Sequence, residues 1–125
     1  MIYNESPQFK KDVKRLSKKW RSIPNDIAAA KLHITPLYEQ LDKNVSLDLY
    51  RQAFFSGKRA AILAVADESD TEVIKMRLDC ETLGTNSKTR LIFVAVRSQQ
   101  TVTFVELYAK NEKPREDPDR YRSFC

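Results

Sequence analysis

The sequence predicts an α+β fold in which two N-terminal helices pack on an antiparallel four-stranded sheet. Apolar residues recur at helical spacing in residues 6–41, and they recur as runs or alternating positions at strand spacing after residue 58. Two helices followed by a sheet meander form separate layers, in which the helices cover one face of the sheet. The 125 residues, 42% of them hydrophobic, suit one domain spanning residues 1–125.

Two helices are expected in the N-terminal third. Ser6-Pro7 is a start signal, because serine caps a helix and proline suits its first position. The apolar stripe that follows is Phe9, Val13, Leu16 and Trp20. The second helix is expected over residues 24–35, because Pro36 lacks an N–H donor and should kink or end it, although a short continuation to Asp42 stays open. Residues 46–54 suit a short helix or, almost equally, a strand.

Four strands are expected at residues 59–66, 72–79, 90–97 and 101–108. The first is a continuous apolar run, which indicates a buried strand. In the second, apolar residues alternate with Lys75 and Arg77, so these two cations share one face. Residues 67–70 should form a turn, 80–88 a loop and 98–100 a hairpin connection. The tail should stay extended until a final turn at residues 119–124.

The excess positive charge is concentrated on the first helix. The chain carries a net charge of +5, and residues 8–22 alone hold seven basic side chains against one acidic one. Such a helix face attracts nucleic acid or an acidic protein segment, although it also suits an ordinary solvated face. The candidate RNA-binding residues on it are Lys10, Lys11, Lys14, Arg15, Lys18 and Lys19.

Several classes of protein are excluded by what the sequence lacks. It has one histidine, His33, and two distant cysteines, Cys80 and Cys125, which argues against a metal site, a Cys-His or Ser-His-Asp mechanism and a disulfide framework. It has no glycine-rich phosphate-binding motif. The longest apolar run, residues 60–66, is too short to span a bilayer. We therefore expect a soluble cytoplasmic protein without a metal ion, cofactor or membrane partner.

A cluster of cations is expected on the sheet. Lys75 and Arg77 share a strand face, Arg90 opens the next strand, and Tyr108 and Lys110 end the last one. If the strands pair in sequence order, these groups gather on one surface. Several cations with one aromatic ring suit a bound phosphodiester, although a solvated sheet face is the common alternative.

The same residues carry a resemblance to a known family. Residues 105–113, VELYAKNEK, followed by Arg115-Glu116-Asp117 and Asp119-Arg120-Tyr121, resemble the C-terminal signature of RelE-like toxins of the RelE/ParE toxin–antitoxin superfamily. Residues 74–78 resemble the basic strand of that family, and residues 88–93 its step from an arginine into an apolar strand. Residues 9–20 resemble its first helix. The resemblance covers most of the chain outside residues 37–66.

This resemblance implies a RelE-like fold and the toxin of a type II toxin–antitoxin pair, with a cognate antitoxin as partner. Relatives in the RelE branch are endoribonucleases that cleave mRNA on the ribosome without a metal ion. Two alternatives stay open: a ParE-like toxin that inhibits DNA gyrase without catalysis, and an inactive member that only binds RNA or protein. Because Lys75, Arg77 and Arg90 form a basic strand pair, they favour the endoribonuclease over the gyrase inhibitor.

Roles for these residues follow from the chemistry of metal-free RNA cleavage. The ribose 2′-hydroxyl attacks phosphorus, so a group must accept its proton and cations must stabilise the charge on phosphorus. Without a nearby histidine, the hypothesis makes Lys75 or Lys110 the proton acceptor. Arg77 and Arg90 would bind the phosphate, and Tyr108 would orient or stack a base.

Overall fold

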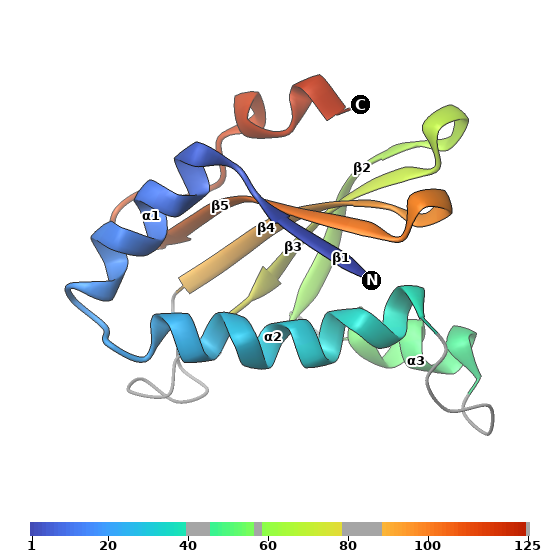
Figure 1. Ribbon diagram of the computed structural model, residues 1–125, viewed down its shortest axis with the longest axis horizontal. Coiled ribbons are helices and arrows are strands. Elements are labelled where there is room, and N and C mark those ends of the chain that lie inside the picture. Colours follow the sequence, from blue (N-terminus) through green and yellow to red (C-terminus); the bar gives the residue numbers. More distant parts are fainter. Residues whose placement is uncertain (40–45, 57–58, 79–88, 125) are drawn as a thin grey trace.

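The computed structural model describes residues 1–39, 46–56, 59–78 and 89–124 (Figure 1). In this part the chain forms three α-helices: α1 (Pro7–Ser17), α2 (Ile23–Tyr38) and α3 (Leu47–Phe54). Five strands accompany them: β1 (Ile2–Glu5), β2 (Ala60–Ala66), β3 (Thr71–Arg77), β4 (Thr89–Val96) and β5 (Thr101–Ala109). Short 3₁₀ turns follow β2 and β4, namely η1 (Asp67–Ser69) and η2 (Arg97–Gln99), and two more lie in the C-terminal tail, η3 (Pro118–Arg120) and η4 (Arg122–Phe124). The α+β prediction is confirmed.

The strands form one mixed sheet in the order β1-β5-β4-β3-β2, whereas four antiparallel strands were predicted. The meander β2 to β5 is antiparallel, but β1 pairs parallel to β5. The missed strand is short and mostly polar, so the sequence gives it no clear period. It is held by tertiary contacts, because the Tyr3 ring stacks on Phe104 with the ring centroids 5.7 Å apart.

The helices form where expected but continue further. Ser6 caps α1 by accepting a hydrogen bond from the Phe9 N–H at 3.1 Å. The predicted end of α2 at Thr35 was too early, because the helix runs through Pro36 to Tyr38. A proline in the last turn removes only one N–H donor, and burial of the neighbouring Leu37 side chain favours the extra turn. The predicted continuation over residues 40–42 lies outside the described residues.

The helix alternative for residues 46–54 is confirmed, since α3 begins directly after Ser46 and ends at Phe54. This third helix was not part of the predicted two-helix layer. Two interactions hold it in place. The Tyr50 hydroxyl donates to the His33 carbonyl oxygen at 2.6 Å, and Arg51 forms an ion pair with buried Glu72 at 3.1 Å.

The apolar run of β2 is an edge strand, so the prediction of a buried strand was wrong. Ile62 is 45% exposed and Val65 is 52% exposed, because no strand among the described residues lies beyond β2. An apolar run alone cannot distinguish a central strand from an edge strand. The strand also contains a bulge between Ile62 and Ala64. The turns after β2 and β4 are confirmed, and each ends in a left-handed residue, Asp70 and Gln100.

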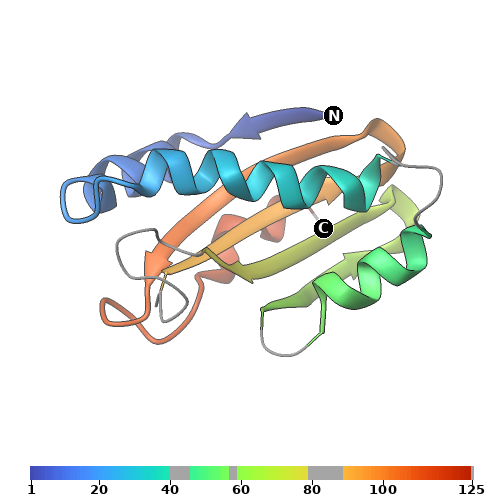
Figure 2. The same cartoon turned by 90° about the horizontal axis from the view of Figure 1, so that it is seen from below.

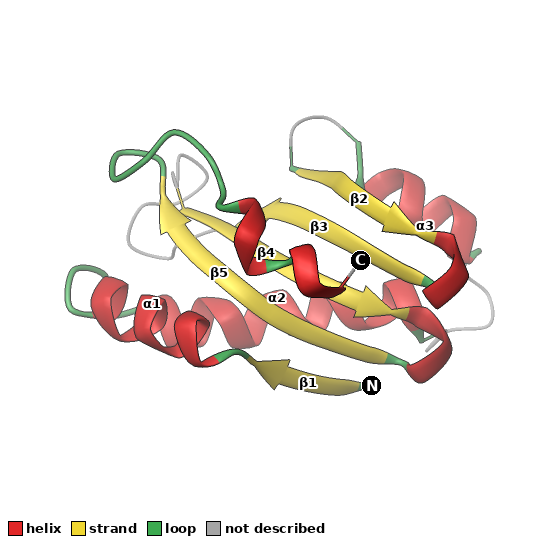
Figure 3. Ribbon diagram, turned by 90° about the horizontal axis from the view of Figure 1, so that it is seen from above, coloured by secondary structure: helices red, strands yellow, loops and turns green. Residues whose placement is uncertain are grey.

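Both faces of the central strands are covered. One face packs against the helices around residues such as Ile34, Leu91 and Phe104. The other packs a smaller apolar cluster that includes Tyr108 and partly buried Tyr121. Figures 2 and 3 show α2 and α3 on one side of the sheet and the turns η3 and η4 on the other. The C-terminal tail lies over this second face.

The predicted loop at 80–88 and both cysteines lie outside the described residues. None of the described helices combines the length and apolar character needed to cross a membrane.

Candidate functional site

The predicted cations come together on the sheet face opposite α2 and α3. The strand register places Arg77 of β3 opposite Arg90 of β4, and Arg90 opposite Tyr108 of β5. Lys75 lies two residues before Arg77 and therefore shares its face. Three neighbouring strands thus contribute Lys75, Arg77, Arg90 and Tyr108 to one patch, which we call the cationic row.

The two arginines of the cationic row are placed unfavourably for each other. Arg90 is only 9% exposed. Its pKa lies below the ordinary value of arginine because burial removes water from the guanidinium and because the positive charge of Arg77 is close. The Nε atom of Arg77 is buried without a hydrogen-bond partner among the described residues. A buried donor without an acceptor is costly, so the pair is suited to receive an anion.

Glu116 of the C-terminal tail closes the other end of the cationic row. Its carboxylate lies 2.9 Å from the Lys75 Nζ atom and accepts from the Tyr108 hydroxyl at 3.5 Å. Burial acts to raise the pKa of Glu116, but the hydrogen bond and charge of Lys75, a backbone hydrogen bond and the Tyr108 hydroxyl together outweigh burial, so the pKa falls below the ordinary value. Glu116 is therefore ionised at neutral pH and occupies the place of an anion beside Lys75.

Tyr108 is enclosed rather than open to a nucleotide base. Its side chain is fully buried, and the Lys113 ammonium lies 5.3 Å from the centre of its ring. Burial, together with the charges of Glu116 and Glu106, raises its pKa to about 12. The hydroxyl therefore stays protonated at neutral pH and can donate a hydrogen bond. A base reaches this ring only if the tail moves away.

Two acidic residues of this face were missed from the sequence. Glu106 is buried, forms an ion pair with Lys113 and accepts from the Asp117 N–H at 2.8 Å. Like Glu116, it holds the tail against the sheet. The signal was present as acidic residues within the C-terminal signature, but their partners are set by how the tail folds back.

The remaining predicted residues do not join the cationic row. Lys110 is exposed in the turn that follows β5. Lys10, Lys11, Lys14 and Arg15 are exposed on α1, whereas Lys18 and Lys19 are exposed just after the helix ends at Ser17. Arg15 is engaged in ion pairs with Asp12 and Glu112, both at 3.1 Å. The basic helix face is therefore a separate surface, which lies on the β5 side of the sheet (Figure 3).

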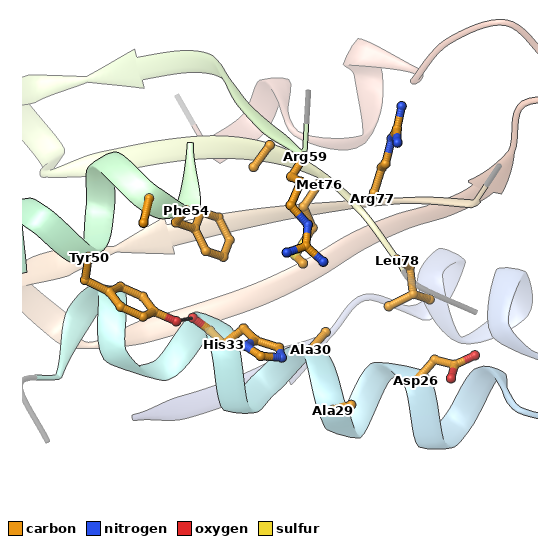
Figure 4. Close-up of a pocket in the computed structure, with 12 residues that line it drawn as sticks. Asp26, Ala29, Ala30, His33, Tyr50, Phe54, Arg59, Met76, Arg77 and Leu78 are labelled. Carbon is orange, nitrogen blue, oxygen red and sulfur yellow. Dashed lines mark hydrogen bonds between the residues drawn. The ribbon is translucent and has the colours of Figure 1, made fainter. Parts of the chain in front are cut away.

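Apart from the cationic row, a pocket lies between α2, α3 and the β2–β3 edge (Figure 4). It has a volume of about 260 Å³ and is lined mainly by apolar residues, including Ala30, Phe54 and Met76. His33 is exposed at its rim, as the sequence allowed, and Arg77 extends away from it toward the opposite face. Within the described residues, no group of three or more His, Cys, Asp or Glu side chains is placed to hold a metal ion.

Comparisons with known proteins find similarity in structure but none in sequence. The chain matches no protein-family model, and no curated protein gives a significant match. Among solved structures it is similar to a chain of the archaeal RelE–RelB complex from Pyrococcus horikoshii OT3. That similarity has a TM-score of 0.45 and 14% sequence identity, and it covers 90% of this chain and 97% of the other.

Proposed function

We propose that this protein is the toxin of a type II toxin–antitoxin pair and that it cleaves mRNA on the ribosome without a metal ion. The observation that carries the proposal is the cationic row, in which Arg77 and Arg90 face each other across two strands with a buried donor left without an acceptor. The resemblance of residues 105–113 to RelE-like toxins supplies the substrate class.

The arrangement supports a defined set of roles. The 2′-hydroxyl of the message attacks the adjacent phosphorus, the bond to the 5′-oxygen breaks, and a cyclic phosphate and a 5′-hydroxyl remain. Arg77 and Arg90 would bind the phosphate oxygens and stabilise the charge that develops on them. Lys75 would add a third cation once the RNA displaces Glu116 from it.

The reaction also needs one group that accepts the proton of the 2′-hydroxyl and one that donates to the leaving oxygen. Of the two lysines in the original hypothesis, Lys75 forms an ion pair with Glu116, whereas Lys110 lies in the turn after β5. The Glu116 carboxylate, displaced from Lys75 by the RNA, would accept the proton of the 2′-hydroxyl, and Lys75 or Lys110 is the alternative acceptor. Tyr108 keeps its proton and would donate a hydrogen bond to the phosphate or the leaving oxygen.

The proposal is tested with ribosome-bound message and three proteins: wild type, Arg90→Ala and Tyr108→Ala. We expect both variants to cleave roughly 100-fold more slowly, as is usual when a donor to developing charge is removed. Tyr108→Phe is the matched control for folding, because it keeps the buried ring and loses only the hydroxyl. Circular dichroism should show the wild-type fold for each protein that is compared.

Equal cleavage by wild type, Arg90→Ala and Tyr108→Ala would remove the cationic row from the mechanism. Separate readouts of translation and DNA supercoiling after induced expression distinguish the gyrase alternative. A change in supercoiling with translation intact would overturn the proposed function.

A further inference from the structure

The C-terminal tail covers the face of the sheet that carries the cationic row. Its residues 113–124 follow the turn after β5, and their two 3₁₀ turns lie over the central strands (Figure 3). Tyr121 packs against the apolar cluster of this face, which includes Val105 and Tyr108. The tail and an RNA bound to the cationic row would therefore occupy the same face of the sheet.

We propose that residues 113–124 form an autoinhibitory strap, in which Glu116 takes the position of a substrate phosphate and RNA binds only after the strap has detached. The inference rests on the proposed function in one respect, namely that the cationic row binds the phosphodiester of RNA. It goes further, because the closed arrangement is then the inhibited state and the whole tail, rather than Glu116 alone, is the inhibitor.

Glu116 competes directly with a phosphate group. Its carboxylate lies 2.9 Å from the Lys75 Nζ atom and accepts from the Tyr108 hydroxyl at 3.5 Å, so it uses a cation and a donor that would serve a phosphate oxygen. Two anions placed at one site would also repel each other. Binding of RNA at this end of the cationic row therefore requires that Glu116 leaves Lys75.

A phosphate group has one advantage over the strap. The Nε atom of Arg77 is buried and has no hydrogen-bond partner among the described residues, so the closed strap leaves this donor of the cationic row unsatisfied. A phosphodiester that reaches Arg77 would supply the missing acceptor and relieve the cost of the buried donor. RNA can therefore displace a carboxylate that occupies only one end of the row.

The strap is held by contacts that can open without disturbing the sheet. Glu106 of β5 pairs with the Lys113 ammonium and accepts from the Asp117 N–H at 2.8 Å. Further along the strap, Arg120 donates to Asp12 of α1 at 3.0 Å. The strap forms no strand of the described sheet, and neither of its 3₁₀ turns contains a buried residue. Segments with few buried apolar contacts are those that open locally.

The strap has a defined point of attachment. Glu112 accepts from Arg15 of α1 and from the Ala109 N–H, both at 3.1 Å, so the turn after β5 is fixed to the rest of the protein. The strap begins with the next residue, Lys113. An open strap therefore stays tethered beside the cationic row, and Glu116 can return to Lys75 when the RNA leaves.

The test measures binding rather than cleavage, because Glu116 is also the proposed proton acceptor. The probe is a fluorescent oligoribonucleotide with a methyl group on every 2′-oxygen, so its nucleophiles are blocked, and its Kd is measured by fluorescence anisotropy. Glu116→Gln should lower this Kd roughly tenfold, because loss of the ion pair raises the fraction of protein with an open strap.

The matched control is Asp119→Asn. It removes the same charge from an exposed side chain of the strap, which pairs with Arg122. The Kd should change by less than about twofold, because exposed ion pairs contribute little.

A second variant separates opening of the strap from general electrostatics. Lys113→Gln removes a positive charge, which by itself weakens binding to RNA. It also breaks the contact with Glu106, so the strap predicts the opposite result, a Kd lowered roughly threefold. Hydrogen exchange followed by mass spectrometry should also show faster exchange in residues 113–124 when wild type binds the probe, with β4 and β5 unchanged.

Several results would overturn the strap: no binding of the probe, no tighter binding by Glu116→Gln, an equal gain in Asp119→Asn, weaker binding by Lys113→Gln, or no faster exchange in residues 113–124. Cleavage of ribosome-bound message by wild type is measured separately. Cleavage without opening of the strap would remove the strap and keep the proposed function. Probe binding with opening of the strap but without cleavage would keep the strap and remove the proposed function.

Discussion

Asp12→Ala is expected to lower the free energy of unfolding by about 3–5 kcal/mol, the usual cost of breaking a buried ion pair from one side. The Asp12 side chain is only 4% exposed. It accepts hydrogen bonds from Arg120 at 3.0 Å and from the Leu107 N–H at 3.0 Å. Alanine would leave the guanidinium and the backbone N–H buried without this acceptor. Urea unfolding followed by circular dichroism measures the change.

The control for this prediction is Lys11→Ala, which removes an exposed side chain from the neighbouring position on α1. It should change the free energy of unfolding by less than about 0.5 kcal/mol. If Asp12→Ala costs as little as Lys11→Ala, then Asp12 does not join α1 to the sheet and the tail as described. The contact matters for the site, because Arg120 also donates to the Val105 carbonyl oxygen at 2.9 Å and so anchors the tail that carries Glu116.

Arg77→Gln is expected to slow RNA cleavage roughly 100-fold without lowering stability. The variant removes a positive charge next to Arg90 and replaces the buried Nε donor that has no acceptor among the described residues. Both changes relieve unfavourable interactions in the protein without RNA, so the free energy of unfolding should stay equal or rise. Loss of activity with gain of stability is the signature of a residue kept for binding.

Cleavage of ribosome-bound message and urea unfolding, measured on the same preparation, test this prediction. The control is Arg97→Gln. Arg97 is exposed in the turn between β4 and β5 and pairs with Asp70 of the turn between β2 and β3. This variant should leave the cleavage rate unchanged. A large loss of stability in Arg77→Gln would show that Arg77 has a structural role, and an unchanged cleavage rate would remove it from the site.

The sequence was sufficient for the parts of the fold that rest on local periodicity. The stripe of Phe9 and Leu16 predicted the buried face of α1, and the alternation around Ile74 and Lys75 predicted which side chains of β3 share a face. The cluster of Arg77 with Arg90 followed from assuming that consecutive strands pair, which is common in antiparallel sheets.

The sequence was insufficient where tertiary contacts decide the outcome. β1 has only four residues and is recruited by pairing with β5. β2 is an edge strand because no other strand of the described residues lies beyond it, and an apolar run does not reveal this. The tail lies over the cationic row because Glu106 of β5 accepts a hydrogen bond from the Asp117 N–H and Glu116 pairs with Lys75 of β3. No local sequence pattern encodes these two pairs.

The chemical ends of the cleaved message test the central claim most directly. Attack by the 2′-hydroxyl at the cationic row predicts an upstream fragment ending in a 2′,3′-cyclic phosphate and a downstream fragment beginning with a 5′-hydroxyl. Mass spectrometry of the fragments identifies these ends, and Arg77→Gln should form the same fragments roughly 100-fold more slowly than wild type. An intact message, or fragments with 5′-phosphate and 3′-hydroxyl ends, would contradict the mechanism.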